Sequence, residues 1–124
     1  MRGIKINPTD RTIEEVDVPN PNNTLQGLYD LIGCDLVQLI ELDRGIILVC
    51  DEEGKLKPIT GAFTFFGNED LVIAGIALVL GGNANRFGKL REGIASFNML
   101  VQWVDPADVP EPKFTFIPLT NERI

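Results

Sequence analysis

The sequence predicts a single α+β domain over residues 1–124, in which a mixed sheet is built around one buried strand at residues 71–80. Three observations point to this class. Segments before residue 51 alternate apolar and polar residues as strands do, and one short segment between them has the apolar spacing of a helix. Ten successive residues from Leu71 to Leu80 carry no charged or polar side chain, which is typical of a strand covered on both faces. The expected order is strand, strand, helix, strand, strand, buried strand and smaller C-terminal elements.

The first fifty residues predict two hairpins joined by a helix. Residues 3–6 and 12–18 are expected to pair across the turn-forming residues 7–10. A short helix is expected at 25–32, with Asn23 or Thr24 capping its first turn and Gly33 ending it. Residues 35–42 and 45–50 form the clearest predicted hairpin, around a tight turn at 43–45.

The pattern after residue 50 is less regular. Residues 51–58 predict an acidic turn, and residues 59–66 fit either a strand or a distorted helical turn. Gly81 and Gly82 are interpreted as the turn that ends the buried strand. Residues 90–104 fit both a helix and a strand, and their length favours the helix. A Pro-rich linker at 105–112 and a short strand at 113–117 are expected to follow.

The net charge of −7 comes entirely from the first part of the chain. Residues 1–53 hold eleven acidic and four basic residues, whereas residues 54–124 hold seven of each. This imbalance argues against direct nucleic-acid binding, and it either serves solubility or attracts a basic partner surface. The residues of the candidate acidic face are Glu14, Glu15, Asp17, Asp51, Glu52 and Glu53.

No catalytic or cofactor-binding pattern is complete. The chain has no histidine, which removes cysteine–histidine pairs and the usual zinc sites. Gly88-Lys89 lacks the earlier glycine and the following hydroxyl residue of a P-loop, because Asn83 and Leu90 stand at those positions. The glycines of 81–88 lack dinucleotide-binding spacing, and the acids of 51–53 lack the alternate spacing of a calcium loop. We therefore expect a protein that is not an enzyme and that uses no metal and no cofactor.

Arg86, Lys89 and Arg91 form a local basic cluster directly after Gly81 and Gly82. Cations and exposed backbone amides in a glycine-containing loop can together bind an anion, so these residues are a candidate site for a small phosphorylated ligand. Phe87, within the same cluster, could stack on a base or instead fill the core. The alternative is a solvated basic loop that compensates for acidic charge elsewhere.

Three stretches of the chain carry a family resemblance. Leu28-Tyr29-Asp30-Leu31-Ile32-Gly33-Cys34 leads into a hairpin, the hairpin ends in the acidic bend Asp51-Glu52-Glu53-Gly54-Lys55-Leu56, and the strand Ile73-Ala74-Gly75 to Gly81-Gly82 follows. This arrangement resembles the small phage- and plasmid-encoded proteins of the domain of unknown function 3846 family. Residues 1–82 follow the family plan, with Ile76 in place of the family's Asp, and residues 85–112 are expected to be a family-divergent insertion. The resemblance implies a mobile-element context and supplies no catalytic residue.

The residues at the start of the chain show no signal peptide, and the longest apolar run is about half of the ~20 residues that a membrane helix needs. We therefore expect a protein of the host cell cytoplasm with reduced Cys34 and Cys50 and no membrane partner.

Together these observations favour a non-enzymatic accessory protein of a phage or mobile element. It would bind a host component, either a host protein or a small phosphorylated ligand, and so counter host defence. A second hypothesis is an acidic nucleic-acid mimic that occupies a host DNA-binding protein. A third is a structural or homo-oligomeric assembly subunit, with Met99 and Trp103 at the interface.

Overall fold

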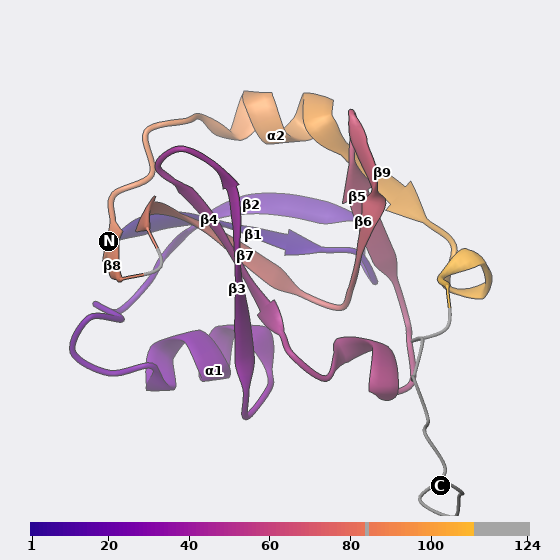
Figure 1. The fold of residues 1–124 in the computed structure, drawn as a ribbon, viewed down its shortest axis with the longest axis horizontal. Helices are drawn as coiled ribbons and strands as arrows, with labels where there is room; N and C mark the ends of the chain where they lie inside the picture. The colour runs from indigo at the N-terminus through magenta and orange to yellow at the C-terminus, as the bar shows by residue number, and fades with distance from the viewer. Residues whose placement is uncertain (84, 111–124) are drawn as a thin grey trace, which may run out of the picture.

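The computed structural model describes residues 1–83 and 85–110, which form nine strands and two α-helices (Figure 1). The strands are β1 Arg2–Asn7, β2 Thr12–Asp17, β3 Val37–Asp43, β4 Ile46–Asp51, β5 Ala62–Phe65, β6 Asn68–Ala74, β7 Ala77–Asn83, β8 Arg86–Gly88 and β9 Val101–Val104. The helices are α1 Gln26–Ile32 and α2 Ile94–Leu100, with short 3-10 turns at Gly54–Leu56 and Pro106–Asp108. The α+β class is therefore confirmed, while the strand expected at 113–117 lies outside the described residues.

The strands form two sheets. In the large sheet the order is β2-β1-β7-β4-β3, with β8 pairing the last residues of β7, and in the small sheet it is β6-β5-β9. All the pairings among the described residues are antiparallel, so the expectation of a mixed sheet is wrong. The β1–β2 and β3–β4 hairpins form where the alternating sequence predicts them. This order leaves β2 and β3 as the two edges of the large sheet.

The apolar run 71–80 is not one strand. It is divided between β6, which belongs to the small sheet, and β7, which lies at the centre of the large sheet. The chain changes sheets at Gly75, whose φ of +88° is a left-handed conformation that favours glycine. The prediction failed here because both strands are apolar, so that no polar residue marks the break between them.

Gly81 and Gly82 do not end the central strand, because both lie within β7 and pair with Gly88 and Phe87 of β8. A Cβ atom on Gly81 would lie 2.2 Å from the carbonyl oxygen of Lys89, so the close approach of the two backbones requires glycine. β8 is also bound by the side chain of Asn22. Its Oδ1 accepts from the Phe87 N–H at 3.0 Å, and its Nδ2 donates to the Phe87 carbonyl at 3.0 Å. The Asn22 amide therefore binds β8 as a neighbouring strand would.

Replacement of Asn22 by alanine is expected to lower the free energy of unfolding by about 2 kcal/mol. Two hydrogen bonds are lost, and the partly buried N–H and C=O of Phe87 are left without their partner. Urea unfolding followed by Trp103 fluorescence measures the loss. Asn23→Ala is the matched control, because the neighbouring Asn23 is exposed and its removal is expected to change stability little. Equal effects of the two substitutions would contradict this role for Asn22.

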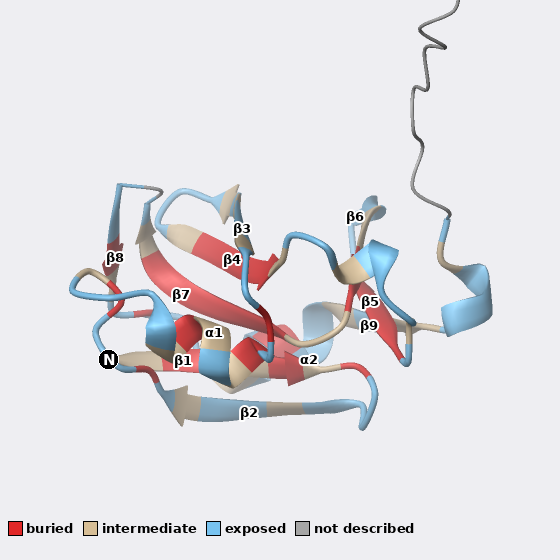
Figure 2. Ribbon diagram, turned by 90° about the horizontal axis from the view of Figure 1, so that it is seen from below, coloured by how far each residue is buried: buried red, intermediate tan, exposed pale blue. Residues whose placement is uncertain are grey.

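The large sheet lies between two layers, each enclosing a core (Figure 1). α1 covers one face, where Leu28 and Ile32 pack with the apolar residues of β4 and β7. α2 and the small sheet cover the opposite face, where Phe63 and Phe97 belong to the second core. Figure 2 shows β7 and much of β4 buried, whereas β2 and β3 at the edges are largely exposed.

Residues 90–104, whose apolar spacing fits both a helix and a strand, contain one of each: α2 ends at Leu100 and β9 begins at Val101. Both expectations are therefore partly correct. Phe87 lies in the core on the α1 side, and Leu90 and Phe97 lie in the other core. Residues 85–110 thus contribute to both cores. Within the described residues, no helix has the length and apolar character needed to cross a membrane.

Candidate functional site

Residues of β3 line three depressions, which together we call the edge groove because β3 is an edge strand. One, of about 350 Å³, lies between β3 and β6 and includes Ile40, Cys50 and Ile73 among its lining residues. The second depression, of about 300 Å³, lies between the β3–β4 hairpin and neighbouring aromatic residues. Its apolar lining consists of Leu42, Ile46, Phe65, Phe66, Phe97 and Leu100. The third, of about 660 Å³, opens at the β3–β4 turn around Glu41 and Asp43. Because β3 contributes residues to all three, the groove runs along this strand.

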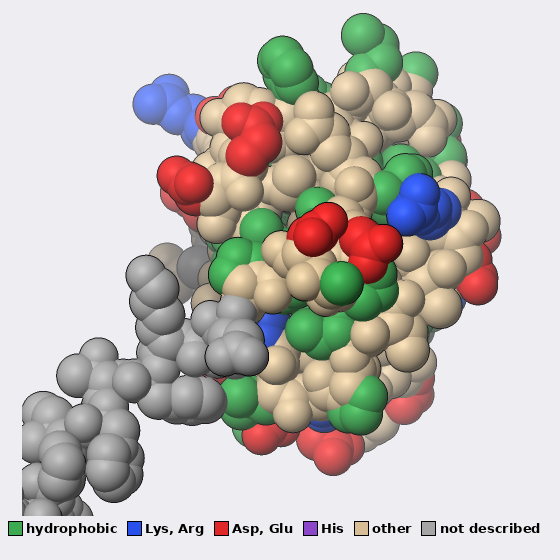
Figure 3. All heavy atoms as spheres, turned by 90° about the vertical axis from the view of Figure 1, so that its right-hand side faces the viewer, with side chains coloured by type: hydrophobic (Ala, Val, Ile, Leu, Met, Phe, Trp, Pro, Cys, Tyr) green, Lys and Arg blue, Asp and Glu red, His purple; other side chains and the backbone are tan. Residues whose placement is uncertain are grey.

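Apolar side chains are exposed along and beside this groove. Leu36 is 48% exposed and Leu39 is 37% exposed, and Leu39 packs against neither core. At the other wall Phe66 is 69% exposed, and its N–H donates to the carbonyl of Leu100 at 2.7 Å. Figure 3 shows apolar side chains projecting at the top of this end of the molecule, where α2 and the β5–β6 turn lie in Figure 1. Leu39, like Val37, faces the α1 side of the sheet, opposite to the groove, so exposed apolar side chains flank the β3 edge on both faces. Exposed apolar surface beside a strand edge is a common feature of protein interaction sites.

The polar groups at the inner end of the groove are held by local contacts. Asp51 accepts from Lys57 Nζ at 2.7 Å, and this hydrogen bond raises the pKa of Lys57. Cys50 is buried, and the loss of hydration together with the nearby Asp51 charge raises the pKa of its thiol to about 11. Burial and the Asp51 charge also raise the pKa of Cys34. Both cysteines are free thiols, and a raised pKa disfavours the nucleophilic thiolate.

The free energy of unfolding is expected to fall by about 2 kcal/mol between pH 9 and pH 11 because of Cys50. The folded state keeps the thiol proton over this interval while the unfolded state loses it, so rising pH favours unfolding. Urea unfolding of the wild type and of Cys50→Val across this interval measures the effect as a difference in slope. Parallel pH profiles of the two proteins would show that Cys50 makes no such contribution.

The candidate anion site is only partly available to a ligand. Arg86, Lys89 and Arg91 are exposed, but Phe87 is buried in the core on the α1 side and presents no stacking surface. Three backbone amides of the loop are also engaged, because the Asn83 side chain accepts from the N–H of Asn85 and of Arg86, and Asn22 accepts from that of Phe87. Gly81 and Gly82 serve strand pairing. The three cations are therefore exposed, while the described amides of residues 85–87 already have acceptors.

The candidate acidic face is not one surface. Side chains alternate along β2, and the pairing with β1 places Glu14 on the α1 side of the sheet and Glu15 and Asp17 on the other. Asp51, with Glu52 and Glu53 after it, lies at the end of β4, three strands away or about 14 Å.

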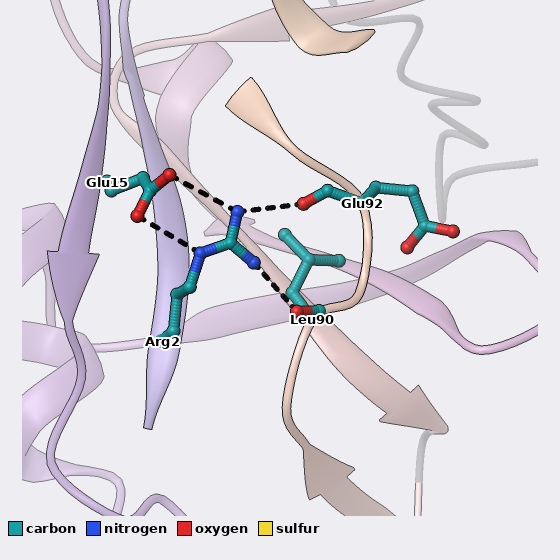
Figure 4. A network of polar contacts seen from close by, with 4 residues as sticks. All are labelled: Arg2, Glu15, Leu90 and Glu92. Atoms are coloured by element: carbon teal, nitrogen blue, oxygen red, sulfur yellow. Dashed lines mark hydrogen bonds and ion pairs between the residues drawn. The ribbon is translucent and has the colours of Figure 1, made fainter. Parts of the chain in front are cut away.

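Several of these carboxylates already have partners. Arg2 Nε and Glu15 Oε1 lie 3.1 Å apart, and the same guanidinium donates to the carbonyls of Leu90 and Glu92 (Figure 4). Asp17 pairs with the amino group of Met1 at 3.3 Å. The acids on β2 have a simpler structural role, since charged residues on an edge strand discourage pairing with another chain.

The sequence reasoning missed the exposed apolar residues at the β3 edge, Leu36 and Leu39, and Phe66 in the wall of the groove. The available signal was the adjacent apolar pairs Leu36-Val37 and Leu39-Ile40, which place apolar side chains on both faces of a strand that lies at an edge. Of the two expected interface residues, Met99 is 83% exposed, whereas Trp103 packs against the core. Within residues 1–83 and 85–110, no three acidic, cysteine or histidine side chains come together as metal ligands.

Comparison with known proteins identifies a family and a relative, and neither description gives an activity. The family model described as "Domain of unknown function (DUF3846)" matches residues 1–102. The chain is similar to "Uncharacterized protein y4iR" of Sinorhizobium fredii, with 32% identity over 117 residues, 87% of this chain and 70% of the relative. No solved structure matches the chain.

Proposed function

The chain belongs to the family described as Domain of unknown function (DUF3846). We propose that it is a non-catalytic binding protein. It acts as an accessory protein of a phage or mobile element and binds a host protein through the edge groove, which would serve to counter a host defence. The observation that carries this proposal is the edge of β3, with which no described strand pairs: Leu36 and Leu39 are exposed there, and the groove beside it is walled by Phe66 and Leu100.

The geometry favours a host protein over the other two binding hypotheses. A phosphorylated ligand would need free backbone donors near Arg86, and the described amides there are bound to Asn83 and Asn22. A nucleic-acid mimic would need a continuous row of carboxylates, and those of β2 lie on both faces of the sheet. The groove, in contrast, combines apolar walls with a strand edge that no described strand covers, which is a surface suited to a protein chain.

Leu39→Lys is expected to reduce strongly the recovery of the bound host protein. The substitution removes an apolar contact and places a cation on the edge strand, and we expect at least a ten-fold loss of recovery, equivalent to about 1.4 kcal/mol. The measurement is affinity capture from a lysate of the bacterium that carries the gene, with quantitative mass spectrometry. The wild type and two variants are compared in parallel.

Leu25→Lys is the matched control, because Leu25 is 38% exposed and precedes α1, away from the groove. The proposal requires proteins that the wild type and Leu25→Lys recover equally and that Leu39→Lys does not. Circular dichroism and urea unfolding should show that both variants keep the fold, since Leu39 packs against neither core. Equal recovery by all three proteins would refute the proposed surface.

A further inference from the structure

The backbone of β3 has one set of hydrogen-bonding groups directed away from the sheet. The carbonyl of Leu36 accepts from Glu52 on the β4 side, and residues 38 and 40 face Cys50 and Leu48 in the same register. Because backbone groups alternate sides along an antiparallel strand, those of Val37, Leu39 and Glu41 point outward. No described strand pairs with this side of β3. We call these three residues the outward positions of β3, because their backbone N–H and C=O groups point away from β4.

The other edges are less suited to pairing. β2 carries Glu14, Glu15 and Asp17, and β6 begins with the exposed polar residues 68–70. β9 has only four residues. β3 has seven residues. Its two charged residues, Glu41 and Asp43, are both acidic and lie near its end.

The side chains of β3 define what a neighbouring strand would meet. Gln38, Ile40 and Leu42 share the face that lines the groove, since the first two line one depression and Leu42 lines the next. A strand added about 4.8 Å beyond β3 would place alternate side chains, roughly 6.6 Å apart, beside these residues. On the opposite face its other side chains would lie beside the exposed Leu39. Apolar residues at alternate positions of the added strand would therefore be covered by the groove.

The charge around the β3 edge indicates which residues would lie between the apolar residues of a partner segment. Asp51 in the groove is paired with Lys57, which leaves three lining carboxylates, those of Glu41, Asp43 and Glu52, against the two basic residues Arg44 and Lys55. A partner segment with lysine or arginine between its apolar residues would complement this excess, and an acidic one would be repelled.

We infer that the occupant is an extended segment of another protein, with apolar residues at alternate positions and lysine or arginine between them, which adds as a strand to the outward positions of β3. This inference rests on the proposed function and specifies how the host protein is held. Main-chain hydrogen bonds supply affinity in such strand addition, and the pockets for alternate side chains supply specificity.

The test selects partners from a displayed library of random dodecapeptides against the full chain. Selected peptides are expected to alternate apolar and basic residues, and to bind Leu39→Lys at least ten-fold more weakly than the wild type or Leu25→Lys. Each of the best binders is then synthesised with N-methyl groups on its odd or on its even residues. Only one edge of an added strand faces β3, so one of these two series should lose at least ten-fold in affinity and the other should bind like the parent.

Several results would overturn the inference. The library could yield no binder, the binders could be insensitive to Leu39→Lys, or the two N-methylated series could bind with equal affinity. A dimer of the free chain that Leu39→Lys converts to a monomer, measured by light scattering, would assign the edge to a second copy instead. If host-protein capture depends on Leu39 but N-methylation has no effect, the proposed function stands and strand addition fails.

Discussion

Replacement of Phe63 by alanine is expected to lower the free energy of unfolding by about 4 kcal/mol. Phe63 is fully buried in the core between the two sheets, and its ring meets that of Phe65 edge-to-face with centroids 5.6 Å apart. The substitution removes the apolar contacts, the aromatic pair and the filling of the cavity together. Because a domain of this size is stabilised by about 5–15 kcal/mol, a large share of the total would be lost. Urea unfolding at equilibrium measures the change.

The matched substitution is Phe66→Ala, three residues along the same segment. Phe66 is exposed, so its removal is expected to change the free energy of unfolding by less than about 0.5 kcal/mol. If strand addition uses the wall of the groove, the same variant should weaken host-protein capture. A large stability loss with Phe66→Ala would mean that this ring serves the fold rather than binding.

Gly81→Ala is expected to cost about 3 kcal/mol and to displace β8. A Cβ atom at this position would meet the backbone of Lys89, its carbonyl oxygen at 2.2 Å and its carbonyl carbon at 2.6 Å. Backbone atoms cannot turn aside as a flexible side chain can, so β8 must move away and withdraw Phe87 from the core. Urea unfolding measures the loss, and faster amide exchange at residues 86–88 reports the displacement.

Gly45→Ala separates this steric effect from the cost of an unusual backbone conformation. Gly45 has a φ of +81° but no atom within 4 Å of an added Cβ, so its substitution should cost only about 1 kcal/mol. Amide exchange at β8 should then stay unchanged. If Gly81→Ala costs no more than Gly45→Ala, β8 does not pack against β7 as closely as the structure shows.

Local signals predicted the local elements. The β1–β2 and β3–β4 hairpins follow from alternation and turn residues, and α1 follows from its spacing and from Gly33, which ends the helix in a left-handed conformation. The resemblance also identified the family correctly. These features depend on residues close together in the sequence, so they could be predicted from this single sequence.

Long-range pairing set the features that the sequence did not reveal. Gly75 changes sheets within an uninterrupted apolar run, and the pairing of β8 with β7 brings Lys89 against Gly81. The edge groove depends on the same information, because β3 forms it only as the last strand of the large sheet. Leu39 would be an ordinary buried residue in a central strand, and the sequence does not say which position β3 takes.

Amide hydrogen exchange of the captured complex tests most directly whether the edge of β3 is the binding surface. The outward N–H groups of Val37, Leu39 and Glu41 have no strand partner in the described part of the free chain. Host-protein binding is expected to slow exchange at these amides at least ten-fold, while β2 and residues 86–91 keep their rates. Slowed exchange confined to residues 86–91 or to β2, with no change at Leu39 and Glu41, would contradict this expectation.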